Sequence, residues 1–378
     1  MIHVAFVIDT IESPTAGTEK QLLLLLKFLD KSKFRPTLCV LRSSRWLEEE
    51  FDACPLYVVG IESFKSFKGL FGIARLARFF RREGVHIVQT HFRDSSIAGI
   101  LAARVAGIET IVATRRNQGY WLTPIELKIQ KFLNQWVTVF IANSNSTKQW
   151  LMKTEGVKSE RIHVIYNAID LAPFESLGYE DRIAMRQMLS IPEETAVVGI
   201  VANLRPVKGI DVFLRSAALV REQVPGVRFL IVGEGSERSF LETLSRELGL
   251  DDSVSFLGRR EDVERLLTAF DVGVLSSHSE SFSNAVIEYF AAELPVVSTD
   301  VGGSREAIED GINGFIVHVG DFNALAAAVC RILKVNVTRK MVINGLNRVK
   351  SEFSISNMIE TYDDIYTNKR LTSTQYKS

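Results

Sequence analysis

Short apolar runs alternate with longer helical patterns along the first half of the chain. Strands that are buried on both faces of a parallel sheet read as continuous Val and Ile runs, and their alternation with helices is typical of α/β proteins. The helical patterns span residues 18–30, 66–83, 94–106, 123–136 and 145–154. The runs that predict strands are HVAFVI (3–8), PTLCVL (36–41), PLYVV (55–59), HIVQT (86–90), TIVAT (110–114), TVFIA (138–142) and HVIY (163–166).

The pattern breaks at residues 167–178, which have no periodicity and are interpreted as a linker, and then it restarts. Helical patterns cover residues 208–223, 236–248, 261–269, 283–292, 304–309 and 321–333. The strands are AVVGIVA (196–202), RFLIVG (228–233), VSFLG (254–258), VGVLSS (272–277), PVVST (295–299) and GFIVH (314–318). We therefore expect two doubly wound, Rossmann-like α/β domains, with ligands at the carboxyl ends of their strands in the cleft between them.

The predicted boundaries are 1–170 for the N-terminal domain and 171–355 for the C-terminal domain. Residues 356–378 are expected to form a C-terminal helix, packed back toward the N-terminal domain, and a tail. A chain of 378 residues agrees with two domains of this size.

Composition adds a charge asymmetry to this picture. Lys and Arg number 45 in total and so do Asp and Glu, which gives no global signal for nucleic-acid binding. Residues 1–170, however, carry 23 basic against 16 acidic side chains, and the remainder carries 22 against 29. The halves are thus expected to meet different partners, the first an anionic one.

The N-terminal run has no basic start and ends at Asp9, which favours a buried strand over a signal peptide. No uncharged apolar stretch approaches the roughly 18 residues that a membrane span needs. We therefore expect a cytoplasmic protein. Cys39, Cys54 and Cys330 form no CxxC pair and no metal-ligand spacing, so they are expected to be reduced thiols.

The motif ESFSNAVIE (280–288) follows a buried strand and opens a helix. It places Glu280 in the loop and Glu288 inside the helix. The helix start near Ser283 and Asn284 would direct backbone N–H groups toward a phosphate. The alternative is a capped helix that carries two unrelated acids.

Two further strand-to-helix connections carry candidate phosphate ligands. In ANLRPVKGID (202–211), Arg205 and Lys208 can both reach a diphosphate, unless they are merely solvated surface cations. In TIESPTAGTEKQ (10–21), Gly17 permits close backbone approach at a helix N-terminus, and a plain turn glycine is the alternative. GxGxxG is absent there, which argues against a nicotinamide oxidoreductase.

Together these motifs, with YNAID (166–170), VGEG (232–235), SFLGR (255–259) and STDVGGSREAIEDGINGFIV (298–317), give a close resemblance to a known family. The chain resembles the family-4 retaining glycosyltransferases, the group 1 type, of the GT-B fold, in which two Rossmann-like domains face each other across a cleft. The resemblance covers nearly the whole chain and is more specific in the second domain.

The resemblance implies roles for these residues. Arg205 and Lys208 would bind the donor diphosphate and stabilise the leaving group. Glu288 would hold the ribose hydroxyls, and Glu280 would face the donor sugar near the reacting carbon. The other positions implied to bind the donor are Gly17, Ser283, Asn284, Gly233, Glu234 and the Phe256–Arg259 segment, which includes Gly258 and Arg259.

The first domain departs from the family pattern. Where many relatives have a histidine that touches the donor sugar, this chain reads ATRRNQG, with Arg115 and Arg116. His91, at the end of the preceding strand, is then the candidate catalytic histidine, and a structural role in capping the following helix is the alternative. Arg116 is a second candidate, for an anionic acceptor or the donor phosphate.

The expected chemistry needs no cofactor and no metal. Leaving-group charge would be stabilised by fixed cations and helix-end amides, and no DxD-like metal site is present. We favour front-face attack, in which a donor phosphate oxygen helps to take the acceptor proton, and a covalent role for Glu280 stays open.

Residues 64–82 contain six basic side chains, no acid and an apolar helical stripe. A basic amphipathic helix can bind anionic lipid at the inner face of the membrane, and an ordinary crossover helix is the alternative.

The sequence thus predicts a retaining transferase that moves a sugar from a nucleotide sugar to a glycan or lipid-linked acceptor of the cell surface. A UDP-sugar is favoured over a GDP-sugar as donor. The alternatives are a non-catalytic sugar-nucleotide-binding protein and a GT-B relative such as a sugar-nucleotide epimerase.

Overall fold

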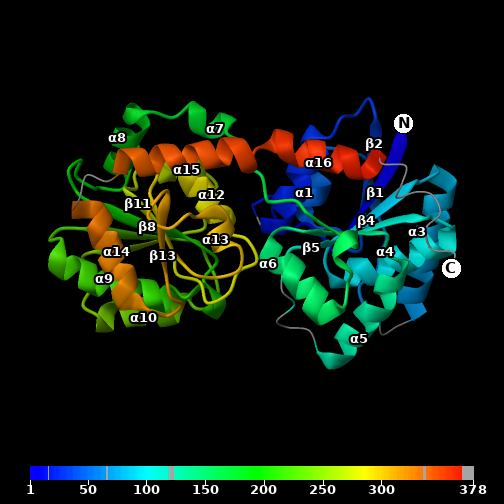
Figure 1. Cartoon of the computed structure of the whole chain (residues 1–378), viewed down its shortest axis with the longest axis horizontal. Coiled ribbons are helices and arrows are strands. Elements are labelled where there is room, and N and C mark those ends of the chain that lie inside the picture. The colour runs from blue at the N-terminus through cyan, green and yellow to red at the C-terminus, as the bar shows by residue number, and fades with distance from the viewer. Residues whose placement is uncertain (16, 65–66, 118, 120–122, 335–337, 368–378) are drawn as a thin grey trace. The chain divides into compact units, whose positions relative to one another are not determined.

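The computed structural model describes residues 1–15, 17–64, 67–117, 119, 123–334 and 338–367. The chain forms two compact units (Figure 1). Unit 1 comprises Met1–Asn167 together with the C-terminal segment from Ile355 onward, and unit 2 comprises Ala168–Ser354.

Unit 1 contains a parallel sheet in the order β3-β2-β1-β4-β5-β6-β7. The order reverses direction between β1 and β4, which pair in parallel with Val4 opposite Ile87. The strands are β1 (Ile2–Ile8), β2 (Phe34–Val40), β3 (Leu56–Val58), β4 (Ile87–Thr90), β5 (Thr110–Arg115), β6 (Val139–Ala142) and β7 (Ile162–Val164). The helices are α1 (Gly17–Phe28), α2 (Arg45–Glu49), α3 (Phe67–Glu83), α4 (Arg93–Ala106), α5 (Pro124–Leu133), α6 (Asn145–Trp150) and α16 (Ile355–Thr367).

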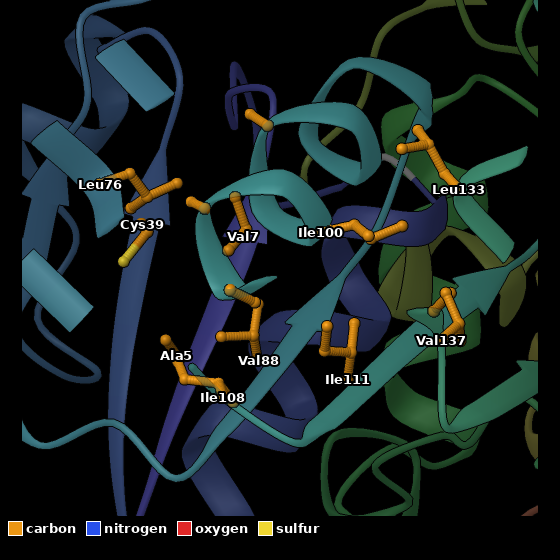
Figure 2. Close-up of a cluster of buried hydrophobic side chains, with 14 of the residues drawn as sticks. Ala5, Val7, Cys39, Leu76, Val88, Ile100, Ile108, Ile111, Leu133 and Val137 are labelled. Carbon is orange, nitrogen blue, oxygen red and sulfur yellow. The ribbon is translucent and has the colours of Figure 1, made fainter. Parts of the chain in front are cut away.

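The core of unit 1 is built from the apolar strands and the helices that cover them. Figure 2 shows side chains of β1, β4 and β5 gathered on the face of the sheet that α4 covers. Gly99 in α4 allows this close packing, because a Cβ at that position would lie 2.6 Å from the methyl carbon of Thr90. Burial of such apolar surface stabilises the fold by about 25 cal/mol per Å².

The C-terminal helix α16 is part of unit 1 and lies beside α1. The ring of Tyr366 packs against Phe34 and Phe6, with ring centroids 5.5 Å and 6.4 Å away. Lys33 forms an ion pair with Asp363 at 2.8 Å at the edge of the contact. The last helix thus completes the core of the first unit, and residues 368–378, which include the predicted tail, lie outside the described residues.

Unit 2 contains a second parallel sheet, in the order β10-β9-β8-β11-β12-β13. Its order reverses direction between β8 and β11, where Val198 lies opposite Val272. The strands are β8 (Val197–Val201), β9 (Arg228–Val232), β10 (Val254–Gly258), β11 (Val272–Leu275), β12 (Val296–Thr299) and β13 (Gly314–Val317). The helices are α7 (Ala172–Glu175), α8 (Tyr179–Met188), α9 (Ile210–Gln223), α10 (Arg238–Glu247), α11 (Val263–Leu267), α12 (Asn284–Ala291), α13 (Ser304–Ala307), α14 (Phe322–Lys334) and α15 (Thr338–Glu352).

Every strand expected from the sequence is present, within two residues at each end. The apolar pattern of the sequence did not predict four helices, the short α2 and α7 and the longer α8 and α15. The segment interpreted as a linker contains α7, whose Phe174 is buried. Its neighbour α8 is fixed to the sheet by Arg182 and Arg186, which donate to the carboxylate of Asp271 at 2.6 Å and 2.8 Å.

The basic stretch 64–82 is largely a crossover helix. Leu76 and Phe80 of α3 are buried in the core of unit 1, which matches the structural alternative for this segment. Leu70 and Phe71 stay 65% and 74% exposed; residues 65 and 66 lie outside the described residues. None of the helices in the described part of the chain has the length and hydropathy that a membrane span requires.

Candidate active site

The carboxyl ends of β8 and β11 bring Lys208 and Glu280 together, although 72 residues separate them in the sequence. The Nζ atom of Lys208 lies 2.5 Å from Oε1 of Glu280. Ser277 donates a further hydrogen bond to the same oxygen at 2.9 Å. The pair sits at the point where the strand order reverses, which is where doubly wound sheets bind ligands. An ammonium group has three N–H donors, so Lys208 can hold Glu280 and still donate to a phosphate.

Gly209 makes this approach possible. Its φ of +59° is in the left-handed region, and a Cβ there would lie 2.2 Å from the backbone oxygen of Ser276. Ser276 in turn donates from its hydroxyl to the carbonyl of Lys208 at 3.2 Å, and the amide of His278 donates to Val207 O at 2.8 Å. The two loops are therefore linked through backbone groups, which fixes the Lys208–Glu280 pair.

The helix that follows Glu280 begins with Ser283 as its N-cap and Asn284 as its first residue. The Ser283 side chain makes no capping hydrogen bond. Glu288 lies on this helix beside the fully buried Tyr289, whose hydroxyl accepts from the amide of Val201 at 2.8 Å. That bond ties α12, the helix that carries Glu288, to β8.

Gly302, after β12, also borders the Glu280 loop. A Cβ at Gly302 would lie 1.9 Å from the backbone oxygen of Glu280, and the amide of Gly303 donates to Ser281 O at 2.9 Å. The GG pair of the STDVGG motif thus provides the close backbone contact on which the position of Glu280 depends.

Gly233, Glu234 and Gly258, which the family resemblance implies to bind the donor, lie at the carboxyl ends of β9 and β10. Gly233 has a φ of +133°, and its amide donates to Gly258 O at 2.8 Å. Its Cβ would meet Ala202 O at 2.0 Å, so only glycine fits. Glu234 forms an ion pair with Arg238 at 2.7 Å, next to Gly258. Arg259 continues this loop. The geometry brings these predicted residues to the strand edge that also carries Lys208.

Arg205 is placed differently from Lys208. It precedes the single turn Pro206–Lys208 and is exposed. Within the described part of the chain no hydrogen-bond or ion-pair partner of its guanidinium is found. It is therefore available to an anion.

Unit 1 has a pocket of about 280 Å³ at its own strand reversal, beyond the ends of β1, β4 and β5. The pocket is lined by His91, Arg115 and Arg116, three of the residues predicted for the first domain. The sequence did not predict the other lining residues, which are Asp9, Thr18, Phe92, Arg93, Asp94, Thr114, Asn117, Gln130, Trp150 and Glu155.

Asp9, and not His91, caps helix α4. Its carboxylate accepts from the amide of Ser95, in the first turn of α4, at 2.7 Å. The residue before α4, Phe92, provides no side-chain cap. Burial raises the pKa of Asp9, and the Ser95 bonds oppose that change. Because 86 residues separate the two partners, no local sequence signal could have found this cap.

His91 is 2% exposed and is not a helix cap. Burial, with a smaller contribution from Arg116, lowers its pKa to about 3. The imidazole is therefore neutral at physiological pH. The structural alternative of helix capping is wrong, and a catalytic role for His91 stays a prediction.

Arg115 and Arg116 have different surroundings. Arg115 is buried and donates to Glu155 at 3.2 Å and to Asn134 at 3.3 Å, and the Glu155 side chain is fully buried. This ion pair accounts for Arg115 structurally, and a contact with substrate stays a prediction. Arg116 is half-buried, donates to Asn167 Oδ1, and lines the pocket.

Gly17 is the first residue of α1 and is exposed. Glu19 lies in the first turn of the same helix, and burial raises the pKa of its carboxyl group. In the described ranges no group of three or more His, Cys, Asp or Glu side chains is placed to hold a metal ion. Cys39 and Cys330 are buried and Cys54 is half-buried; all three are free thiols.

Comparison with known proteins identifies the family. Residues 181–347 match the model of Glycosyl transferases group 1, and residues 15–173 match the model of Glycosyltransferase Family 4. An Escherichia coli relative, named UDP-Gal:alpha-D-GlcNAc-diphosphoundecaprenol alpha-1,3-galactosyltransferase, is 26% identical over 323 residues, which cover 82% of each chain.

Two solved structures share the fold over nearly the whole length. HepE of Anabaena in complex with UDP has a TM-score of 0.85 at 22% identity and covers 97% of this chain and 100% of its own. WaaG, a glycosyltransferase involved in lipopolysaccharide biosynthesis, has a TM-score of 0.76 at 18% identity and covers 96% of this chain and 99% of its own. The predicted fold class is confirmed. The chain therefore belongs to the glycosyl transferases group 1 and has the GT-B fold of two parallel α/β sheets.

Proposed function

We propose that this chain transfers a sugar from a nucleoside diphosphate sugar to a hydroxyl of a glycan or lipid-linked acceptor, with retention of anomeric configuration. The observation that carries the proposal is the Lys208–Glu280 pair at the strand reversal of unit 2. Lys208, with Arg205 nearby in the chain, supplies positive charge for a leaving diphosphate, and Glu280 is held where the attached sugar would lie.

The donor is proposed to be a UDP-sugar in preference to a GDP-sugar. The Escherichia coli relative is named for UDP-Gal, and HepE was solved with UDP and with UDP-glucose. In this assignment Glu288 accepts from the ribose hydroxyls, and the backbone amides at Ser283 and Asn284 donate to the diphosphate. The nucleotide base would lie along the loop formed by Gly233, Glu234 and the Gly258–Arg259 pair.

Departure of the nucleoside diphosphate leaves positive charge on the sugar ring and adds negative charge to the leaving oxygen. Fixed cations oriented before the reaction stabilise that charge without a metal ion. We favour attack of the acceptor on the same face from which the diphosphate leaves, with a phosphate oxygen taking the acceptor proton. Glu280 as a covalent nucleophile is the competing route.

Ligand protection gives the first test. UDP, GDP, UDP-glucose, UDP-galactose, UDP-GlcNAc and GDP-mannose are each added at millimolar concentration and the thermal midpoint is recorded. A ligand that binds only the folded chain raises the thermal midpoint, because it increases the free energy of unfolding. At a ligand concentration a hundredfold above Kd the increase is about 2.7 kcal/mol. Protection by uridine nucleotides alone supports the proposal. No protection by any of the six contradicts it.

Lys208→Ala tests the role of the pair. Turnover should fall by on the order of a hundredfold or more, because a charge that acts on the leaving group is lost. The thermal midpoint should stay within the range of a surface change. Lys350→Ala, an exposed lysine on α15, is the matched control. Equal turnover in the two variants would remove Lys208 from the mechanism.

Product analysis separates the enzyme from the two other functions. Proton NMR of the product gives the anomeric configuration, and an inverted product would contradict retention. Full activity after treatment with EDTA would support a reaction without metal. Tight binding of a sugar nucleotide with no transfer to any acceptor would favour a binding protein, and conversion of the free sugar nucleotide to its epimer would favour an epimerase.

We also propose that unit 1 binds an anionic membrane surface, where a lipid-linked acceptor would be presented. Leu70 and Phe71 of α3 are not the only large apolar side chains that unit 1 exposes among the described residues. On helix α5, the exposed fractions of Ile125, Ile129 and Phe132 are 71%, 44% and 60%. These three follow helical spacing. The exposed Lys128 and Lys131 lie on the same helix, and such an arrangement suits anionic headgroups.

Vesicle sedimentation tests this. The protein should sediment with vesicles of phosphatidylglycerol and phosphatidylcholine at low salt and not with phosphatidylcholine alone. A variant with Ile125, Ile129 and Phe132 replaced by serine should lose most of the binding. A second variant, with Leu70 and Phe71 replaced by serine, measures how much the stretch 64–82 contributes to vesicle binding. Vesicle binding that neither variant changes would contradict a membrane contact through α5 or through the stretch 64–82.

A further inference from the structure

A buried line of hydrogen bonds connects the C-terminal helix to the pocket of unit 1. The hydroxyl of Tyr366, on α16, donates to Oε1 of Gln89 at 2.6 Å. Nε2 of Gln89 lies 3.4 Å from Nε2 of His91. All three side chains are at most 3% exposed. The line therefore runs through the buried interior of unit 1 to a residue that lines the pocket.

The orientation of the Gln89 amide indicates which nitrogen of His91 carries the proton. Tyr366 occupies the oxygen of the Gln89 amide, so the amide nitrogen faces the imidazole, and an amide nitrogen can only donate. In this orientation His91 Nε2 accepts the hydrogen bond and carries no proton. A neutral imidazole has one N–H group, and here that group is at Nδ1.

Nδ1 of His91 is buried and has no hydrogen-bond partner within the described part of the chain. A buried N–H without a partner costs roughly 1–3 kcal/mol, so its retention needs a reason. His91 lines the pocket of unit 1, where Thr114 Oγ1 is also buried without a hydrogen-bond partner among the described residues. Two unpaired polar atoms at one pocket indicate a ligand that pairs with them.

We propose that Gln89 and Tyr366 are positioning residues, which hold His91 as a neutral Nδ1–H donor to an oxygen atom of the substrate bound in the unit 1 pocket. His91 then does not act as a general base through Nδ1, since that nitrogen already carries the proton. Identification of that oxygen as one of the substrate's rests on the proposed glycosyl transfer. The tautomer itself does not.

Nitrogen NMR of the full chain labelled at its imidazole nitrogens tests the tautomer. His91→Asn identifies the His91 signals by their loss. Two-bond proton–nitrogen correlations should show Nδ1 protonated and Nε2 unprotonated in the wild type. A proton on Nε2, or a doubly protonated ring at neutral pH, would overturn the proposal, and the result does not depend on whether the chain transfers sugars.

Tyr366→Phe removes the hydroxyl that orients Gln89, and the His91 signals should shift toward a mixture of tautomers. Tyr362→Phe is the matched control, because Tyr362 is on the same helix and its buried hydroxyl has no hydrogen-bond partner in the described ranges. It should leave the tautomer unchanged. No difference between the two variants would remove Tyr366 from the positioning role, and the wild-type spectrum decides the tautomer if either variant fails to fold.

The donor role has a kinetic test of its own. Asn at position 91 keeps an N–H group near the place of Nδ1, whereas Leu fills the site without one. With the sugar nucleotide selected by thermal protection, kcat of His91→Asn should exceed that of His91→Leu by on the order of tenfold, the value of one hydrogen bond. Equal kcat values would contradict a donor role even if the tautomer is as inferred.

Discussion

The depressed pKa of His91 predicts how acid changes the stability of unit 1. The folded pKa is about 3, because of burial first and Arg116 second. The ordinary value of about 6.5 applies to the unfolded chain. Below pH 6.5 the unfolded state therefore binds a proton that the folded state does not. The stability that His91 contributes is fully present above pH 6.5 and is lost as the pH falls from there toward 3.

The magnitude follows from linkage. One pKa unit corresponds to about 1.36 kcal/mol, so the loss between pH 7.5 and pH 5 is roughly 2 kcal/mol. His91→Asn removes the titrating group. The variant is expected to be less stable at pH 7.5, and the gap between the wild type and the variant should shrink by about that amount at pH 5.

Urea unfolding followed by tryptophan fluorescence measures this in the unit concerned. The four tryptophans of the chain, at positions 46, 121, 136 and 150, all fall in the sequence range of unit 1. His318→Gln removes an exposed histidine in unit 2 and is the control. If the wild type and His91→Asn lose stability in parallel from pH 7.5 to pH 5, His91 is not buried as a neutral ring and the reasoning is refuted.

Two substitutions test the packing of the sites. Gly209→Ala should cost about 1–2 kcal/mol from its left-handed φ and more from the clash with Ser276 O. Gly311→Ala, with a φ of +75° and no atom within 4 Å, should lose only the first of these two amounts, and equal losses in urea unfolding would show that no clash exists. Glu155→Leu should cost roughly 3–5 kcal/mol by leaving Arg115 buried without its carboxylate, and adding Arg115→Met should restore part of the loss, which thermal unfolding of both variants would reveal.

The strands and the second-unit motif could be predicted because their signals are local. A strand buried on both faces must be apolar at every position, as β8 and β11 are. Helix α15 gave no such signal. Most of its residues are polar, and Gly345 interrupts its helical pattern, yet that glycine is needed because a Cβ there would lie 2.5 Å from the ring of Phe290. Close packing overrides helix propensity at such a position.

Most of the first-unit pocket could not be predicted, because its contacts join distant parts of the chain. The sequence shows that Arg115 and Arg116 are adjacent, but not that Glu155 neutralises only the first of them in the core. It shows neither that Asp9 caps α4 nor that Tyr366 reaches the strand of His91. Each of these depends on the order of strands in the sheet, and a parallel sheet can be wound in several orders from the same pattern of elements.

The two strand reversals differ in what burial does to their charges. In unit 2, Lys208 and Glu280 form an ion pair at the surface of the unit, with 24% and 12% of their side chains exposed. In unit 1, burial keeps His91 neutral and raises the pKa of Asp9. A leaving group that gains negative charge is stabilised by fixed positive charge beside it. A hydroxyl, in contrast, can be bound by neutral hydrogen-bond donors and acceptors, which stay unpaired when that hydroxyl is missing. We therefore propose that unit 2 binds the diphosphate and that the unit 1 pocket binds a hydroxyl-bearing part of the substrate.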